Sequence, residues 1–485
     1  MTMTDRERQL REEPIVPLFF KFSLPAVVGM MVQALYNVVD RYYISNIPGI
    51  GSTAIGGVGI TLPILFILMG FTMLFGIGGA ANISIRMGEG RKDQAERILG
   101  NVFTMLFLVA LGLNLVFLPN LQGALRLFGA TENNVEYAMR YLRIILWGNF
   151  INTFAFAMNH TIRSEGNPRW SMVSMIIGAG TNVVLDPIFI YETIPVLNIP
   201  GLGLGVEGAA YASVLAQGLS FLWGAYYYSS GKSHIRLRRE NLRLHWPTLR
   251  MVMAIGVSPF FIQVAGSLVG ALFNNNLAAY GGELAQGSYA IINSIAILFY
   301  MPIFGMNQGL QPIIGYNYGA QNYDRVKRAV KIGMLVATIV TGLGWAFIML
   351  APQMLVTPMA REDAALRAMT TDGLFKVESL MIIVGFQIIS SNFFASIGKA
   401  KLSFFLSLSR QIFFLIPFLL FLPRVFGLDG IWYAVPLSDL LASLVTVFFL
   451  LNEFRHLDRD HRAKKELDEA ALQEELSCAP TSLIE

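Results

Sequence analysis

The sequence predicts an all-α integral membrane protein with about twelve transmembrane helices, arranged as two six-helix lobes related by a pseudo-two-fold axis. An apolar composition, repeated stretches of membrane-spanning length and an internal repeat predict this fold. Of the 485 residues, 54% are hydrophobic and 14% are charged, whereas a typical soluble domain has about 25% charged residues. The mean hydropathy is +0.54. The composition therefore excludes an ordinary soluble enzyme.

A run of apolar segments along the chain accounts for the predicted helices, because a membrane-spanning helix needs about 20 mostly apolar residues. The segments are 15–45, 54–84, 95–118, 134–160, 169–190, 207–229, 250–280, 284–316, 328–351, 364–396, 402–424 and 429–453. Basic residues gather in alternate loops, mostly on the side of the N-terminus. Because short basic loops stay in the cytoplasm, both termini are predicted to be cytoplasmic.

The chain repeats internally. The segment GVEGAAYASVLAQ at 205–217 aligns with GLDGIWYAVPLSD at 427–439. Each copy holds an even number of spans, so the copies share one orientation, and a site is expected between them. The expected organisation is an N-terminal tail (1–14), a first lobe (15–230), a linker (231–250), a second lobe (251–454) and a C-terminal tail (455–485). The linker pattern IRLRRENLRLHW indicates a short amphipathic stretch at the cytoplasmic interface.

Four acids inside predicted spans are the most informative residues: Asp40, Asp186, Glu378 and Asp439. A charge at the bilayer centre costs about 2.5–3.5 kcal/mol, so such a residue commonly marks an ion or substrate path. At about 1.5 Å per residue, Asp40 lies about 33 Å and Asp186 about 26 Å along their helices from the inner side. Both acids are therefore expected in the outward half of the first lobe.

Polar residues on neighbouring segments fall at a similar depth. We predict an ion- or proton-coupling site formed by Asn37, Asp40, Tyr141, Asn182, Asp186 and Ser213. Two close carboxyl groups in a low-dielectric site favour a neutral form of at least one. The pair could hold a proton, or Na⁺ with oxygens from Asp40, Asn182, Asp186 and Ser213. In the alternative interpretation, Asp40 pairs with Arg41, Ser213 only packs, and Tyr141 belongs to an aromatic belt.

The second half differs in its chemistry. Asn274 stands where the repeat would place a counterpart of Asp40, and Ile416-Pro417 lies near the counterpart of Asp186. The polar residues of this half that are candidates for a substrate cavity are Asn274, Gln308, Glu378 and Asp439. Glu378 has a second interpretation, a structural ion pair with Lys376 or Arg410.

Enzyme motifs are not supported by their context. The glycines of a GxGxxG match at 203–208 follow no predicted strand, which that motif requires. No nucleophile–base arrangement or paired metal spacing is present, so we expect no catalytic residue, no bound metal and no cofactor other than a coupling ion. The basic runs are orientation signals, so no nucleic-acid partner is expected.

Several motifs together resemble the MATE (multidrug and toxic compound extrusion) antiporter family over nearly all of residues 15–453. The first span carries Leu24-Pro25, Tyr36-Asn37 and Asp40 in the family's order. The segments IRSEGNPR at 162–169, GVEGAAYAS at 205–213 and QPIIGYNYGA at 311–320 are also similar to recurring family segments. The resemblance is closest to the DinF/MepA-like branch, in which the acids lie in the N-terminal lobe.

This resemblance implies a multi-pass protein of the bacterial inner or plasma membrane that works as a monomer in the lipid bilayer. It implies alternating access and export of small organic cations or amphipathic drugs against inward H⁺ or Na⁺. Ser213 stands where the family usually has threonine, which leaves Na⁺ coordination open. A lipid-linked saccharide flippase of the same superfamily is one alternative, but it would need more basic residues in its cavity. The second alternative is a different transporter with six plus six helices, such as a major-facilitator protein. Against it, the loop GEGRK at 88–92 lacks the Asp-Arg motif of that class.

Overall fold

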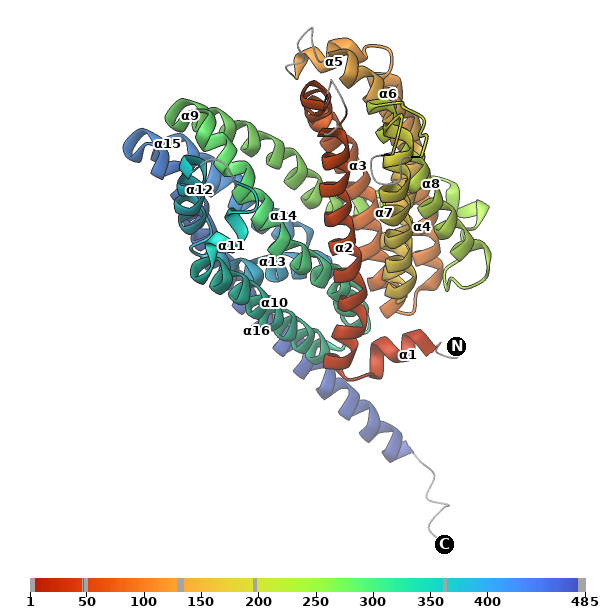
Figure 1. Ribbon diagram of the computed structural model, residues 1–485. Coiled ribbons are helices and arrows are strands. Elements are labelled where there is room, and N and C mark those ends of the chain that lie inside the picture. Colours follow the sequence, from red (N-terminus) through yellow and green to blue (C-terminus); the bar gives the residue numbers. More distant parts are fainter. Residues whose placement is uncertain are drawn as a thin grey trace.

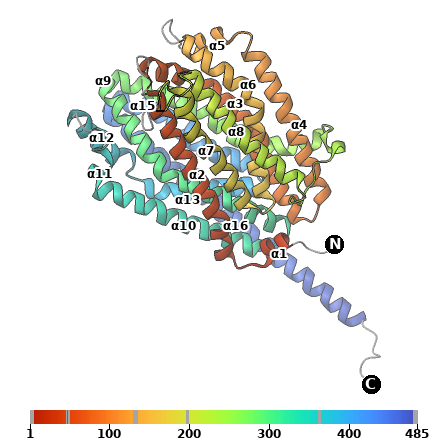
Figure 2. The same cartoon turned by 45° about the vertical axis from the view of Figure 1, so that its right-hand side comes forward.

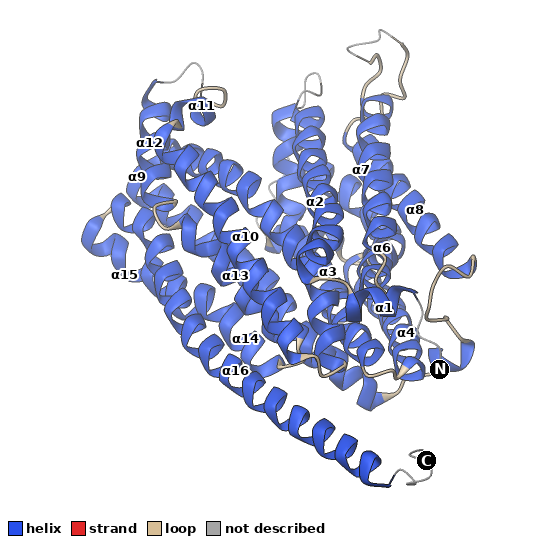
Figure 3. Ribbon diagram, turned by 90° about the horizontal axis from the view of Figure 1, so that it is seen from below, coloured by secondary structure: helices blue, strands red, loops and turns tan. Residues whose placement is uncertain are grey.

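The computed structural model describes residues 5–45, 47, 51–128, 135–194, 199–360 and 364–478. These residues are almost entirely helical (Figure 3). The first half contains α1 (Asp5–Glu12), α2 (Ile15–Ser45), α3 (Gly51–Gly88), α4 (Lys92–Phe117), α5 (Leu121–Leu127), α6 (Val135–Ser164), α7 (Pro168–Ile190) and α8 (Val206–Ser229). The predicted all-helical fold is confirmed.

The short 3₁₀ helix η1 (Arg239–Leu242) lies in the connection between the halves. The second half contains α9 (Trp246–Gly319), α10 (Tyr323–Leu350), α11 (Pro352–Val356), α12 (Ala364–Val377), α13 (Met381–Ser396), α14 (Ala400–Leu408), the π-helix η2 (Ser409–Leu415), α15 (Ile416–Phe426) and α16 (Leu428–Cys478). The helix α16 extends well beyond the bundle (Figures 1 and 3).

Ten of the twelve predicted spans lie almost entirely within one helix, whereas 364–396 covers α12 and α13, and 402–424 covers parts of α14, η2 and α15. Within the described residues, 8 helices are long and apolar enough to cross a membrane, or up to 9 if the bent pair α12 and α13 is one span. The long helix α9 covers two predicted spans and is interrupted at Gly282, whose φ of 64° is left-handed. The fold accommodates twelve crossings, although that number stays a prediction.

The predicted span 364–396 is broken rather than continuous. Helices α12 and α13 meet at an angle of 51°, with residues 378–380 between them. Trp345 Nε1 donates to the Ser379 carbonyl at 2.9 Å, and Ser379 Oγ donates to the Lys376 carbonyl at 2.9 Å. Because backbone groups released inside a bilayer must find partners within the protein, these two hydrogen bonds stabilise the break. Residues 378–380 contain neither glycine nor proline, so the local sequence does not indicate the break.

The two halves of the chain lie side by side and meet at the end of the molecule that carries α1 (Figures 1 and 2). We call this end the basic face, because the lysine- and arginine-rich segments 86–97, 231–250 and 325–331, at the ends of helices and in the connection between the halves, lie there. Toward the other end, the ribbons of the halves diverge (Figure 1). Two glycines permit the close approach: a Cβ on Gly256 would lie 1.7 Å from the Leu74 carbonyl oxygen, and one on Gly78 would lie 2.3 Å from that of Val252. Small residues at helix contacts are typical of membrane proteins.

Candidate functional site

Helix α7 carries two polar side chains, Asn182 and Asp186, one turn apart and pointing into the first half. Asn182 is 1% exposed and Asp186 is fully buried. The Asn182 amide nitrogen donates to Asp186 Oδ1 at 3.1 Å and lies 3.2 Å from Ser213 Oγ on α8. One side chain thus connects a buried carboxyl group with a neighbouring helix.

The second acid, Asp40 on α2, faces the same place. The side chains of Asp40 and Asp186 lie close enough to interact electrostatically. A hydrogen bond between two carboxyl groups needs a proton on one of them, because an ionised carboxylate only accepts. The arrangement is therefore suited to holding one proton between two helices.

Two tyrosines complete the cluster. The Tyr36 hydroxyl forms a hydrogen bond with Ser213 and lies near both acids. Tyr141 on α6 is 7% exposed and also faces Asp40 and Asp186. Four helices (α2, α6, α7 and α8) thus supply the six side chains, which we call the acid-pair site: Tyr36, Asp40, Tyr141, Asn182, Asp186 and Ser213.

Two buried oxygens of this site have unused capacity as acceptors. Within the described residues, neither Asn182 Oδ1 nor Asp186 Oδ2 receives a hydrogen bond. The interactions recorded there for Asp186 also include no lysine or arginine. A buried carboxyl group without a cationic partner is costly when ionised. The site can lower that cost by taking up a proton or a small cation from water.

The structure brings together five of the six residues predicted for the coupling site: Asp40, Tyr141, Asn182, Asp186 and Ser213. The side chain of the sixth, Asn37, lies outside the part of the chain that the structure describes. Sequence reasoning missed the role of Tyr36, which was noted only as part of a family motif. Its spacing of four residues before Asp40 places both on one helix face, and that spacing was the available signal.

The second half holds a different buried network. Glu378 is 3% exposed and Asp439 is 2% exposed. Tyr300 donates its hydroxyl to Glu378 at 2.8 Å, and Arg410 on the π-helix η2 forms an ion pair with Asp439. This network contains its own cation, Arg410. Pairing of Glu378 with Lys376 is wrong as a prediction, because Lys376 binds Asp372 and Asp429, each at 2.6 Å.

The remaining cavity candidates make other contacts. Gln308 accepts a hydrogen bond from Arg163 across the two halves, near the basic face. Arg163 also donates to Asn159 at 2.6 Å and to Ser171 at 3.0 Å. Asn274 is exposed, and its backbone carbonyl accepts from Gln286 at 3.1 Å. A substrate role for these side chains stays a prediction.

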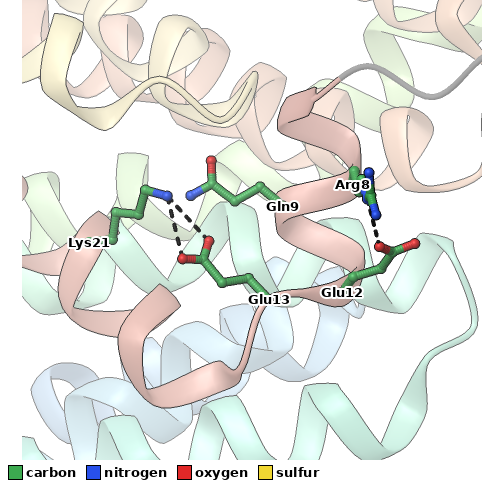
Figure 4. A pocket seen from close by; sticks show the side chains of 5 residues that line it. All are labelled: Arg8, Gln9, Glu12, Glu13 and Lys21. Carbon is green, nitrogen blue, oxygen red and sulfur yellow. Dashed lines mark hydrogen bonds and ion pairs between the residues drawn. The ribbon is translucent and has the colours of Figure 1, made fainter.

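A surface pocket of about 450 Å³ opens on the basic face between α1 and the start of α2. It is lined by Arg8, Gln9, Glu12, Glu13 and Lys21 (Figure 4). Its charges pair locally: Lys21 lies 3.3 Å from Glu13, and Arg8 lies 2.9 Å from Glu12. These exposed pairs neutralise one another, so the pocket differs from the acid-pair site, where Asp186 is fully buried.

A helical membrane bundle with two related halves and a buried carboxyl pair has the features of a secondary transporter. The family model MatE matches residues 25–188 and 259–420, which cover both halves. The chain therefore belongs to the MATE family of multidrug efflux transporters, as the sequence motifs indicated.

Known proteins resemble the chain over nearly its whole length. The "Multidrug export protein MepA" of Staphylococcus haemolyticus is 24% identical over 459 residues, which cover 94% of this chain and 98% of that protein. A solved structure of a MATE protein in complex with MaL6 has a TM-score of 0.87 and 25% identity, covering 94% of this chain and all of that one. An outward-facing structure of a multidrug resistance MATE transporter of the MOP superfamily also has a TM-score of 0.87 and 25% identity, covering 95% of this chain and 100% of that one.

Proposed function

We propose that this protein exports small organic cations or amphipathic drugs in exchange for protons, and that the proton binds at the Asp40–Asp186 pair. The observation that carries the proposal is the close approach of these two acids within one cluster, with Asp186 fully buried. Relatives named for multidrug export support the substrate class. The family membership supports transport rather than catalysis, so we assign no enzyme activity.

The proposed cycle is alternating access between the two halves. The halves are joined at the basic face and diverge toward the other end (Figure 1), and we take the basic face to be cytoplasmic because of its arginine-rich loops. This conformation then gives external protons access to the acid pair. Protonation removes negative charge from the first half, which weakens its attraction for a cationic substrate and favours release outside. Return to the inward-open state delivers the proton to the cytoplasm.

The cross-half contacts near the basic face support this assignment of the closed side. Ser23 Oγ lies 3.4 Å from the Met306 carbonyl oxygen, and Asn82 Nδ2 donates to the Met251 carbonyl at 3.3 Å. The Arg163–Gln308 hydrogen bond joins the halves in the same region. These contacts must separate before the basic face can open, so they act as the inner gate of the proposed cycle.

Sodium is the second candidate for the coupling ion. Carboxylate, amide and hydroxyl oxygens are suitable ligands for a hard cation, and Asp186, Asn182 and Ser213 supply one of each within one cluster. A proton is favoured because two adjacent carboxyl groups in a low-dielectric site favour a neutral form of at least one, which can then donate a hydrogen bond to the other.

Transport in proteoliposomes tests the proposal. The wild type, Asp40→Asn and Asp186→Asn are compared for movement of a fluorescent organic cation under an imposed pH gradient and, separately, under an imposed Na⁺ gradient at equal pH. Asp372→Asn serves as the matched control, because its carboxylate is 58% exposed on α12 and lies outside the acid-pair site.

We expect the pH gradient to drive transport by the wild type and by Asp372→Asn, and each acid-pair variant to lose most of it. Transport driven only by the Na⁺ gradient would replace the proton with sodium in the proposal. Asp186→Asn transport equal to that of the wild type would contradict the assignment of the site.

A further inference from the structure

The connection between the halves is bound closely to the side of α4. We call residues 231–246 the linker strap. The amide of Asn101 donates to the carbonyl oxygens of Asn241 at 3.1 Å and Arg243 at 3.2 Å, and its Oδ1 accepts from the His245 backbone N–H at 2.7 Å. Asn101 itself is fully buried. A single buried side chain thus fixes the backbone of three alternate strap residues.

Two buried acids fix the first part of the strap. Glu96, 2% exposed, accepts from the Arg236 backbone N–H at 3.1 Å and pairs with Arg238 at 2.9 Å. Glu165 accepts from Ser233 Oγ at 2.7 Å and from the His234 backbone N–H at 2.9 Å. These contacts make the strap a built element of the fold.

The strap covers the membrane-facing side of α4. Thr104 Oγ1 donates to the Leu242 carbonyl at 2.9 Å. One turn further along α4, Phe107 is 48% exposed and Leu108 is 43% exposed, and residues three or four apart share a helix face. The same face continues as an exposed apolar surface through Leu111 and Leu115. The strap therefore lies where this apolar surface meets the basic face, at the level of the lipid headgroups.

The end of the strap presents apolar side chains at alternate positions. Leu242, Leu244 and Trp246 are 38%, 48% and 67% exposed. The intervening residues Arg243 (φ −66°, ψ 128°) and His245 (φ −116°, ψ 104°) have extended backbones, in which alternate side chains point to the same side. Tryptophan is enriched at membrane interfaces. These three side chains are placed to enter the outer part of the acyl region.

The strap also carries positive charge that the protein does not neutralise. Residues 231–250, which comprise the strap and the first residues of α9 that follow it, contain six basic residues and one acid, Glu240. The carboxylates of Glu96 and Glu240 are both used by Arg238. Arg236, Arg239 and Arg243 are exposed and form no ion pair within the part of the chain that the structure describes. Such arginines are available to bind anions from outside the protein.

We propose that the linker strap is a binding site for the headgroup of an anionic phospholipid of the inner leaflet. The positive charges of the arginines bind the phosphate, since hydrogen bonds between a cationic donor and an anionic oxygen are stronger than those between neutral groups. The leucines and Trp246 hold the adjoining acyl chains. Because the strap joins the two halves, a bound lipid anchors the point at which both halves pivot. Juxtamembrane basic segments are known to select anionic lipids by surface charge.

Native mass spectrometry of the full-length protein in detergent tests this site. The probes are dioleoyl phosphatidylglycerol, dioleoyl phosphatidylcholine and the soluble headgroup glycerol 1-phosphate. The test variant is R236Q/R239Q/R243Q. The matched control, R455Q/R459Q/R462Q, removes the same charge from exposed positions on the projecting part of α16. A charge-retaining variant, R236K/R239K/R243K, separates loss of charge from disturbed folding.

We expect phosphatidylglycerol to bind the wild type more tightly than phosphatidylcholine, and the glutamine variant to lose roughly tenfold or more of this affinity, since each surface charge contributes about fivefold. The α16 control and the lysine variant should keep most of it. Equal binding of both lipids by the wild type, equal loss in the lysine variant, or binding of glycerol phosphate as tight as that of the lipid would overturn the proposal.

Discussion

Asn182 lies one helical turn below Asp186 and donates its amide to the buried carboxyl group at 3.1 Å. The same nitrogen lies 3.2 Å from Ser213 Oγ. Asn182 therefore orients Asp186 and connects α7 with α8, while its own carbonyl oxygen receives no hydrogen bond within the described residues. This relationship makes Asn182 a positioning residue for the proton-binding acid.

Replacing Asn182 with alanine should impair coupled transport. A hydrogen bond to a charged group contributes about 1.5–3 kcal/mol, so we expect transport driven by a pH gradient to fall by about tenfold or more. The control is Asn276→Ala, which removes an amide that donates to the Leu419 carbonyl in the second half at 2.9 Å. If Asn182→Ala transports the substrate as fast as Asn276→Ala under the pH gradient, Asn182 does not position the acid.

The buried pair Arg410–Asp439 should behave as a structural unit. Removal of one partner leaves an uncompensated buried charge, so Arg410→Met or Asp439→Leu should lower the free energy of unfolding by about 3–5 kcal/mol. The double variant R410M/D439L should recover most of this loss, because a buried ion pair exchanged for apolar residues is often neutral in stability. Thermal unfolding of the detergent-purified proteins measures the effect. Additive losses in the double variant would show that the two residues are not coupled.

The contact between Gly78 and Gly256 should control closure at the basic face. Gly256→Leu cannot fit, because its Cβ would lie 1.7 Å from the Leu74 carbonyl oxygen. We expect this variant to populate states that are open at the basic face. In a Cys478→Ser background, spin labels at Lys92 and Arg328 should report longer distances than in the parent protein.

Gly266→Leu is the matched control for this experiment, since nothing lies within 4 Å of a Cβ at that position on the same helix. Its distance distribution should equal that of the parent. An unchanged distance distribution for Gly256→Leu would contradict the role of Gly78 and Gly256 in closing the basic face.

Much of the acid-pair site could be predicted from the sequence because acids are rare within apolar spans. Asp40 and Asp186 stand out for this reason, and the spacing of Asn182 and Asp186 on one helix places them on the same face. Apolar runs of membrane-spanning length also located most of the helices closely, although 364–396 and 402–424 each cover more than one element. Tyr36 was overlooked as a site residue, although its spacing of four residues before Asp40 places both side chains on one helix face.

Contacts between distant segments could not be predicted in this way. Asp439 and Arg410 come from different helices, and no local pattern pairs them. The break at Ser379 depends on a hydrogen bond from Trp345, which the segment itself does not encode. The fixation of the strap depends on Asn101, a polar residue whose partners are backbone groups of another segment.

In the proposed cycle, substrate and proton compete through Asp40 and Asp186. The most direct measurement is proton release when an organic cation is added to the purified protein in weakly buffered detergent solution with a pH-sensitive dye. We predict about one proton released per bound cation for the wild type, because one carboxyl–carboxyl hydrogen bond holds one proton. Asp186→Asn should still bind the cation but release none. Equal proton release from Asp186→Asn and the wild type would contradict the account.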